Sequence, residues 1–222
     1  MGSRERRQKE QEIRRNDIIE AAERVFFAKG YPYATMDDVA KEAEFSKRTV
    51  YIYFNSKEQI YFEIMIRGYK RLIAMLQEDM ESGDFTDAIE EIKRMSLTLY
   101  RFSRTFPDYF KAIMEYETGE RDFQKGVPDE SREECYALGE KVMGVLIGLL
   151  KKGIAEGSVR ADLDPANTAL VLWACIIGVF NTAGKKEKYI NNYYGLTAEG
   201  LISESFALMI SSIRAGHGGN FQ

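Results

Sequence analysis

The chain has 222 residues, of which 45% are hydrophobic and 30% are charged. This composition excludes a disordered chain and is sufficient for one or two domains with buried cores. Only four prolines interrupt stretches rich in Ala, Leu, Glu, Lys, Arg and Met, which favours helices over an all-β sandwich. The two cysteines predict neither a disulfide framework nor structural zinc, and the charged N-terminus without a secretory leader predicts a cytoplasmic protein.

Charge is divided unevenly along the chain. Residues 1–57 carry a net charge of +2 and residues 58–222 a net charge of −6, which indicates that the two ends face different partners. The basic end includes six cations between residues 4 and 15, with three glutamates interspersed. This segment is either a solvated, partly disordered arm or an arm that reaches DNA.

The longest apolar run, residues 169–180, has twelve residues. A bilayer span needs about twenty, so the run predicts a buried helix and no membrane partner.

Apolar periodicity and capping signals predict about nine helices. Gly30 is expected to end the first, and Thr-x-x-Asp and Ser-x-x-Gln capping boxes to begin the second and fourth. The predicted helices span 14–28, 35–43, 46–54, about 25 residues from Ser56, 86–105, 107–118, 131–156, 165–183 and 197–214. Residues 119–130 are predicted to form a loop, and a polar, tyrosine-rich segment after residue 184 is predicted to separate the last two helices.

The second and third predicted helices are short and are joined by a tight turn over residues 43–46, which is typical of a helix-turn-helix. Val50 and Phe54 share the packed side of the third helix, and the opposite side carries Arg48, Thr49, Tyr51 and Ile52. The exposed isoleucine either is an ordinary surface residue or contacts a thymine methyl group.

The cations of this region are placed against the helix dipole. Lys47 and Arg48 occupy the first turn of the third helix, where the dipole disfavours positive charge. Their placement is explained if this helix end meets phosphates or a guanine edge, and Lys57 at the next helix start would meet a backbone phosphate. The alternative is a solvated cationic face.

Residues 14–65 resemble the DNA-binding domain of the tetracycline-repressor (TetR) family of bacterial transcription regulators. The stretch T-M-D-D-V-A-K-E-A-E-F-S-K-R-T-V-Y-I-Y-F-N-S-K-E-Q-I, residues 35–60, contains the family's A-x-x-A, S-K-x-T-x-Y-x-Y-F and S-K-E motifs. The resemblance implies DNA contacts from Thr35, Ser46, Lys47, Arg48, Thr49, Tyr51, Tyr53 and Lys57.

Two residues depart from the family pattern. Glu44 stands where the family usually has glycine, so a residue with a Cβ is expected to adopt a positive φ in the turn. Arg48 replaces a commonly small residue, which suggests an additional base or phosphate contact.

The resemblance also implies a two-part organisation. Residues 1–57 would form the N-terminal arm and helix-turn-helix domain, and residues 58–222 the helical effector-binding and dimerisation domain. Helices eight and nine would pair with their counterparts in a second subunit. The ninth is apolar over more than half its circumference, which is more than one core face needs.

The second domain is rich in aromatic residues and methionine, which suit an adaptable apolar pocket. The expected lining of an effector pocket is Phe106, Tyr109, Phe110, Met114 and Trp173. Glu115 and Glu117 either favour a cationic, lipophilic ligand or form a solvated acidic face. Gly144 and Gly148 are expected to allow close helix packing.

Together these features predict an all-α, homodimeric, ligand-responsive regulator. It would be a repressor that binds palindromic operator DNA through the third helix and is released by a small apolar or aromatic effector. The alternative is a helical protein of the same fold that binds lipids or other hydrophobic ligands without binding DNA. No cofactor, metal or catalytic residue is expected, because the single histidine, His217, lies in a Gly-rich tail and no nucleophile has a base partner.

Overall fold

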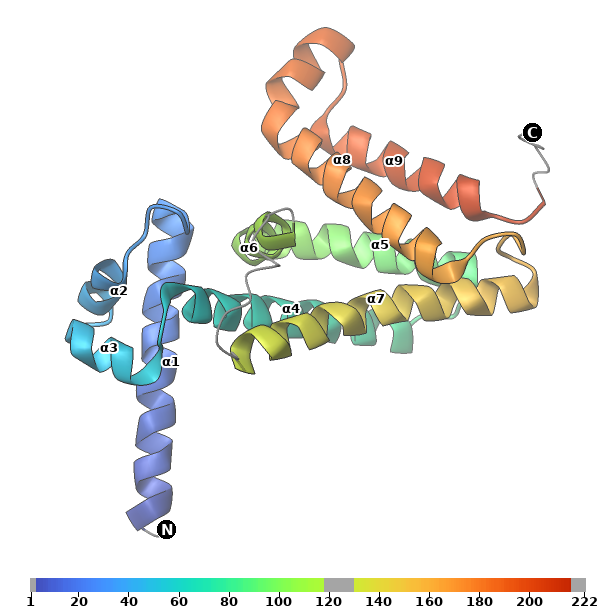
Figure 1. The fold of residues 1–222 in the computed structure, drawn as a ribbon. Coiled ribbons are helices and arrows are strands. Elements are labelled where there is room, and N and C mark those ends of the chain that lie inside the picture. Colours follow the sequence, from blue (N-terminus) through green and yellow to red (C-terminus); the bar gives the residue numbers. More distant parts are fainter. Residues whose placement is uncertain (1–2, 118–129, 217–222) are drawn as a thin grey trace. The chain divides into compact units, whose positions relative to one another are not determined.

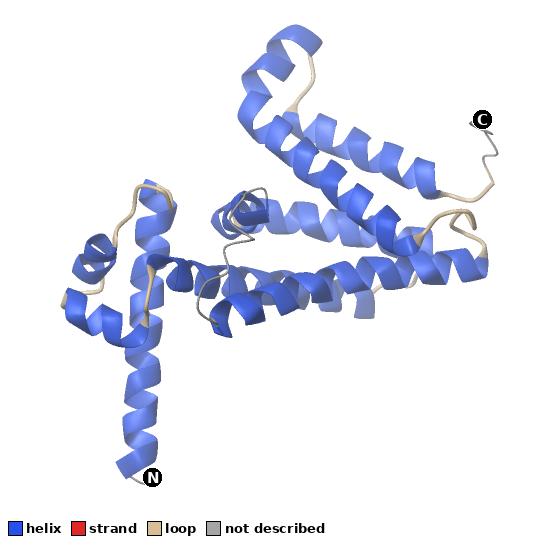
Figure 2. Ribbon diagram, in the orientation of Figure 1, coloured by secondary structure: helices blue, strands red, loops and turns tan. Residues whose placement is uncertain are grey.

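The computed structural model describes residues 3–117 and 130–216, and every regular element in these ranges is a helix (Figure 1, Figure 2). The predicted all-α fold class is therefore confirmed. The helices are α1 (Ser3–Lys29), α2 (Met36–Glu42), α3 (Lys47–Tyr53), α4 (Lys57–Glu81), α5 (Ala88–Thr105), α6 (Pro107–Glu117), α7 (Glu130–Glu156), α8 (Pro165–Tyr194) and α9 (Ala198–Ile213). His217 and residues 119–129 of the predicted loop lie outside the described residues.

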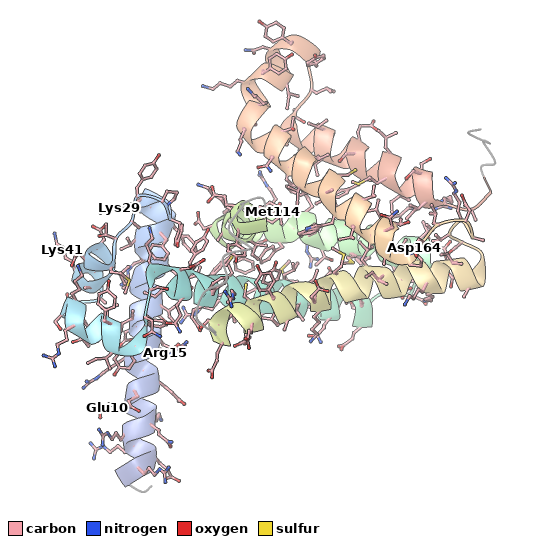
Figure 3. The ribbon with its side chains drawn as sticks, in the orientation of Figure 1. Glu10, Arg15, Lys29, Lys41, Met114 and Asp164 are labelled. Atoms are coloured by element: carbon pink, nitrogen blue, oxygen red, sulfur yellow. The ribbon has the colours of Figure 1, made fainter. Side chains whose placement is uncertain are left out.

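Most predicted helix ends are confirmed by their capping groups. Gly30 follows α1 with φ +81°, and its N–H donates to the carbonyl of Phe26 at 2.8 Å. Asp164, labelled in Figure 3, accepts from the N–H of Asn167 at 2.7 Å at the start of α8. The box predicted at Ser56 is only half formed, because the Gln59 side chain accepts from the N–H of Asn55 instead of Ser56.

Two helices are longer than the sequence predicted. The segment before residue 14 is part of α1 and not a partly disordered arm. The tyrosine-rich segment after residue 184 continues α8, with a kink at Lys186, as far as Gly195 at φ +66°. Both segments consist mainly of Arg, Lys, Glu, Gln, Asn and Tyr, which lack an apolar period but include good helix formers without a breaker.

The Cα positions divide the chain into two compact units: residues 1–71 with 106–138, and residues 72–105 with 139–222. The first contains α1 to α3, most of α4, α6 and the start of α7. Its core includes Ile18 and Ala22 from α1, Val39 from α2, Val50 from α3 and Ile60 from α4, each completely buried. The predicted boundary after residue 57 stays a prediction.

The second unit has its own core. Its buried residues come from α5, α7, α8, α9 and the segment before α8: Ile89, Ile92, Leu146, Leu150, Val159, Ala169, Leu172, Ile210 and Ile213. The segment after α7 is joined to the end of α9, since the N–H of Arg160 donates to Ile213 at 3.0 Å and that of Ala215 to Ser158 at 2.9 Å.

Two predictions about helix packing were wrong. Gly144 and Gly148 of α7 are exposed, and a Cβ at either would meet no atom within 4 Å, so they do not provide close packing within the chain. The apolar helix α8 is also not buried in the chain. By length and composition α8 alone among the described helices could cross a membrane, although only 28% of its most apolar window is buried.

Candidate DNA-reading site and comparison with known proteins

The turn between α2 and α3 is closed by backbone hydrogen bonds. Ala43 ends α2, Glu44 follows with φ +57°, and the N–H of Phe45 donates to the carbonyl of Ala40 at 2.9 Å. A left-handed residue directly after a helix lets the chain reverse within one turn while it satisfies the last carbonyls of that helix. The expectation that Glu44 adopts a positive φ is thus confirmed.

Ser46 begins α3 and holds its first turn. The Ser46 hydroxyl accepts from the N–H of Thr49 at 3.0 Å, and the Ser46 and Thr49 side-chain oxygens are 2.8 Å apart. Val50 and Phe54 are buried below the helix, with 0% and 1% of their surface exposed. One side of this short helix is therefore committed to the core, which leaves the other side to face outward.

The outward side of α3 presents the residues expected there. Ile52 is 72% exposed, and Arg48 and Tyr51 are also exposed, whereas Thr49 and Tyr53 are half-buried. A side chain such as Ile52 gains nothing from this position in the isolated chain. The surface is chemically mixed, with a guanidinium, a phenol and an aliphatic group within two turns.

The predicted cations differ in their environment. Lys47 lies 2.7 Å from Asp37 of α2, and this hydrogen bond raises the pKa of Lys47 above its ordinary value. Lys57 instead donates to the carbonyls of Tyr31 and Ala34 at 2.7 and 2.9 Å, with its ammonium 4.3 Å from the centre of the Tyr31 ring. Lys57 therefore fastens the loop between α1 and α2 to the start of α4.

Thr35 has a structural role at the start of α2. Its hydroxyl accepts from the N–H of Asp38 at 3.1 Å, and its own N–H donates to the Asp38 carboxylate at 3.0 Å, so the capping box is complete. Hydrogen bonds from Lys29 and then Thr35 lower the pKa of Asp38 from 3.8 to about 2. The α2 start thus keeps its charged cap over the whole neutral range.

Helix α1 supports the site through polar contacts that sequence patterns did not indicate. Arg15 pairs with Glu63 of α4 at 2.6 Å, and its guanidinium lies 4.9 Å from the centre of the Phe54 ring. Glu23 accepts from Arg67 of α4 at 3.1 Å and from the Tyr109 hydroxyl of α6 at 2.8 Å. The residues in each pair are far apart in sequence, so these contacts are seen only in the structure.

The expected effector residues are distributed over both units. Phe106 directly precedes α6, and Tyr109, Phe110 and Met114 belong to α6, all in the first unit, whereas Trp173 belongs to α8 in the second. Tyr109 and Met114 are buried, and Figure 3 labels Met114 on α6. Burial and then the Glu23 carboxylate raise the pKa of Tyr109. A common pocket for the five residues stays a prediction.

The second unit contains a groove that sequence reasoning missed. It has a volume of about 670 Å³ and lies between α5 and α9. Its apolar surface comes mainly from Leu97, Tyr100, Ile202, Phe206 and Ile210, and Lys93 and Arg214 add cations. The lining residues recur at spacings of one to three along α5 and α9, as one face of a helix does, but nothing in the sequence indicates that these two faces oppose each other.

Comparison with known proteins bears on the helix-turn-helix first. Residues 18–64 match the family model described as "Bacterial regulatory proteins, tetR family". These residues contain the C-terminal part of α1, all of α2 and α3 and the start of α4, the elements that build the outward face described above. This helix-turn-helix domain belongs to the TetR family.

Similarity to relatives extends well beyond this TetR-family domain. The chain is 28% identical over 160 residues to the uncharacterized HTH-type transcriptional regulator YhgD of Bacillus subtilis, covering 72% of this chain and 78% of YhgD. It is 26% identical over 155 residues to the fatty acid metabolism regulator protein of B. subtilis, covering 66% and 71% of the two chains.

Solved structures show the same fold. The fatty acid degradation regulator FadR from Bacillus halodurans superimposes with a TM-score of 0.64 at 18% identity, over 91% of this chain and 97% of that one. With its family and relatives in view, this chain is a DNA-binding transcriptional regulator and not an enzyme.

The strained turn residue leads to a stability prediction. A left-handed conformation costs a residue with a Cβ roughly 1–2 kcal/mol. Glycine avoids this strain, but it lowers the free energy of unfolding by roughly 0.5–1 kcal/mol because its unfolded chain has more conformational entropy. We therefore expect Glu44→Gly to raise the free energy of unfolding by about 0.5–1 kcal/mol, measured by urea denaturation. Glu44→Ala removes the carboxylate but keeps the Cβ, so an equal gain in that variant would contradict backbone strain as the cause.

Proposed function

We propose that the chain is a homodimeric repressor that reads a near-palindromic operator with α3 and leaves it when a small apolar or aromatic effector binds. The observation that supports DNA reading is the outward face of α3, where Arg48, Tyr51 and Ile52 are exposed above a completely packed inner side. Arginine and tyrosine donate hydrogen bonds to base edges and phosphates, and an aliphatic group suits a thymine methyl.

The eight residues implied by the resemblance take different parts in this proposal. Arg48, Thr49 and Tyr51 would contact bases, and Ser46, Lys47 and Tyr53 would contact the backbone beside them. Lys47 would exchange its bond with Asp37 for a phosphate, so the free protein holds this cation close to its binding position. Thr35 and Lys57 would approach phosphates through a loop and helix start that their own hydrogen bonds already order.

Operator binding tests this assignment. We expect the double variant Lys47→Ala, Tyr51→Ala to lose about tenfold or more in affinity, because it removes one charged and one aromatic contact. Affinity is measured by gel shift against duplexes from the region upstream of its own gene. The matched control is Lys188→Ala, Tyr193→Ala, which removes the same two side chains from exposed positions on α8. Parental binding by the α3 variant would overturn the assignment.

Dimerisation through α8 and α9 is proposed from their unpartnered apolar faces. Leu170 and Val171 of α8 are 59% and 54% exposed, and Leu208 of α9 is 69% exposed. Ala174 and Gly178, next to Val171 on the helix surface, are exposed as well and would allow close approach of a second helix. Pairing these faces between two copies would cover the apolar surface that leaves α8 mostly exposed in one chain.

We expect Val171→Glu combined with Leu208→Glu to produce a monomer. Two buried carboxylates, each doubled by symmetry, would oppose association across an apolar interface. Sedimentation velocity measures the assembly state, and operator affinity falls in parallel because two half-sites are no longer coupled. Leu97→Glu is the control, since Leu97 is 56% exposed on α5. A dimeric double variant, or an equal loss in the control, would exclude this interface.

The effector is proposed to bind in the helices that follow the helix-turn-helix. The expected lining is Phe106, Tyr109, Phe110, Met114 and Trp173, and the groove between α5 and α9 is a second place with sufficient volume for a small ligand. A relative named as a fatty acid metabolism regulator agrees with an apolar effector. Native mass spectrometry of the purified protein would identify a retained molecule.

Effector release requires that the ligand prefer one of two conformers. Within the first unit, α6 is joined to α1 by the hydrogen bond from Tyr109 to Glu23, and Glu23 is also bound by Arg67 of α4. A shift of α6 would therefore act on α1, on which α2 and α3 are packed. We infer that this three-residue junction passes an effector-dependent movement to the DNA-reading helix.

A further inference from the structure

The N-terminal part of α1 extends beyond the body of its own unit. Residues 4–14 are helical and every one of them is exposed, whereas Ile18 and Ile19 farther along the same helix are buried. At a rise of about 1.5 Å per residue these eleven residues add roughly 15 Å of helix. In Figure 3 Arg15 lies where α1 passes the end of α3, and Glu10 lies on the part that continues past it.

This extension has one face without acidic residues. At about 100° per residue, six side chains fall within a sector of about 120°. They are Arg4, Arg7, Gln8, Gln11, Arg14 and Arg15. We call this set the α1 stripe. The three glutamates of the extension, Glu5, Glu10 and Glu12, all fall outside the sector, as do Arg6 and Lys9.

The α1 stripe continues the face with which α1 packs on the helix-turn-helix. Ile18, Ala22 and Val25, all buried, lie in the same sector farther along the helix. Arg15 occupies the border, where it pairs with Glu63 at 2.6 Å and lies over the Phe54 ring at the end of α3. The stripe therefore points toward the side of the unit on which α3 ends, and its residues change from apolar to basic where the protein body stops.

Folding alone does not explain this pattern. The dipole of α1 disfavours arginines in its first turns, and in the described part of the chain Arg4 and Arg7 have no ion pair, whereas Arg14 pairs with Glu10 at 3.9 Å and Arg15 with Glu63 at 2.6 Å. Guanidinium and amide groups are the side chains that commonly donate hydrogen bonds to phosphate oxygens. A row of them with carboxylates excluded is complementary to a polyanion.

We propose that the α1 stripe binds the phosphate backbone of the DNA duplex beside the half-site that α3 reads. The inference rests on the proposed function and extends it, because it lengthens the DNA contact of each subunit by a rigid helical rod. A helical rod holds its cations in place before binding, so less conformational entropy is lost than with a disordered arm. The contact is independent of base sequence and increases the dependence of affinity on salt.

Two double variants of equal charge test the proposal. Arg4→Ala, Arg7→Ala removes two cations from the α1 stripe, and Arg6→Ala, Lys9→Ala removes two from the other side of the same turns. Alanine favours helix, so both variants keep α1, which circular dichroism verifies. Binding is measured by fluorescence anisotropy with labelled duplexes that tile the region upstream of its own gene, over a range of salt concentrations.

The stripe variant loses two phosphate contacts in each subunit of the dimer, so we expect it to reduce the slope of log K against log salt by about four, at about 0.9 per lost contact, and the control variant to keep the parental slope. Equal reductions in both variants would indicate a general effect of net charge and overturn the proposal, as would a parental slope in the stripe variant. If the parental protein bound no duplex at all, the proposed function would fail and this inference with it.

Discussion

The structure depends on the reversal of the chain between α2 and α3. Glu44 adopts a left-handed conformation that costs free energy, and this turn allows only four residues to separate the end of α2 from the start of α3. Val50 and Phe54 then reach the core while Ile52 stays outside. A longer connection would let α3 rotate about its axis, so that Val50 and Phe54 would no longer fix which side chains of the helix face outward.

A second constraint is the use of α1 as a support for everything packed on it. Its buried face packs against the helix-turn-helix. Its polar side chains contact α4, since Arg15 donates to Glu63 and Asn16 accepts from Arg67. Glu23 contacts α6 by accepting from the Tyr109 hydroxyl. Because a helix is stiff along its length, displacement of one end is transmitted to the other. The same stiffness would allow the N-terminal extension to hold its arginines at fixed positions.

Local signals in the sequence predicted most of the fold. Capping groups at Thr35, Ser46 and Asp164 follow from one to four neighbouring residues, so pattern reasoning was sufficient, whereas the positive φ of Glu44 followed from the resemblance to the TetR family. The start of α1 and the end of α8 were missed because apolar periodicity was taken as the sign of a helix, and intrinsic propensity would have found both.

Contacts between distant residues could not be predicted in the same way. The internal bonds of Lys57, the Glu23 junction and the groove between α5 and α9 depend on how helices face each other, and short sequence windows contain no such information. For the proposed DNA-contact residues, the sequence indicated which side chains of α3 face away from the core, but not that Lys57 is hydrogen-bonded to the loop between α1 and α2.

The most direct test of the account is photo-crosslinking from the outward face of α3. A benzophenone amino acid placed at Ile52, the most exposed apolar position of that helix, reports whether the face touches a duplex. The account predicts efficient crosslinking of the full-length protein to DNA from its own upstream region at this position and none when the same group replaces Leu97 on α5. Equal crosslinking at both positions, or none from Ile52 while the protein still binds that DNA, would contradict it.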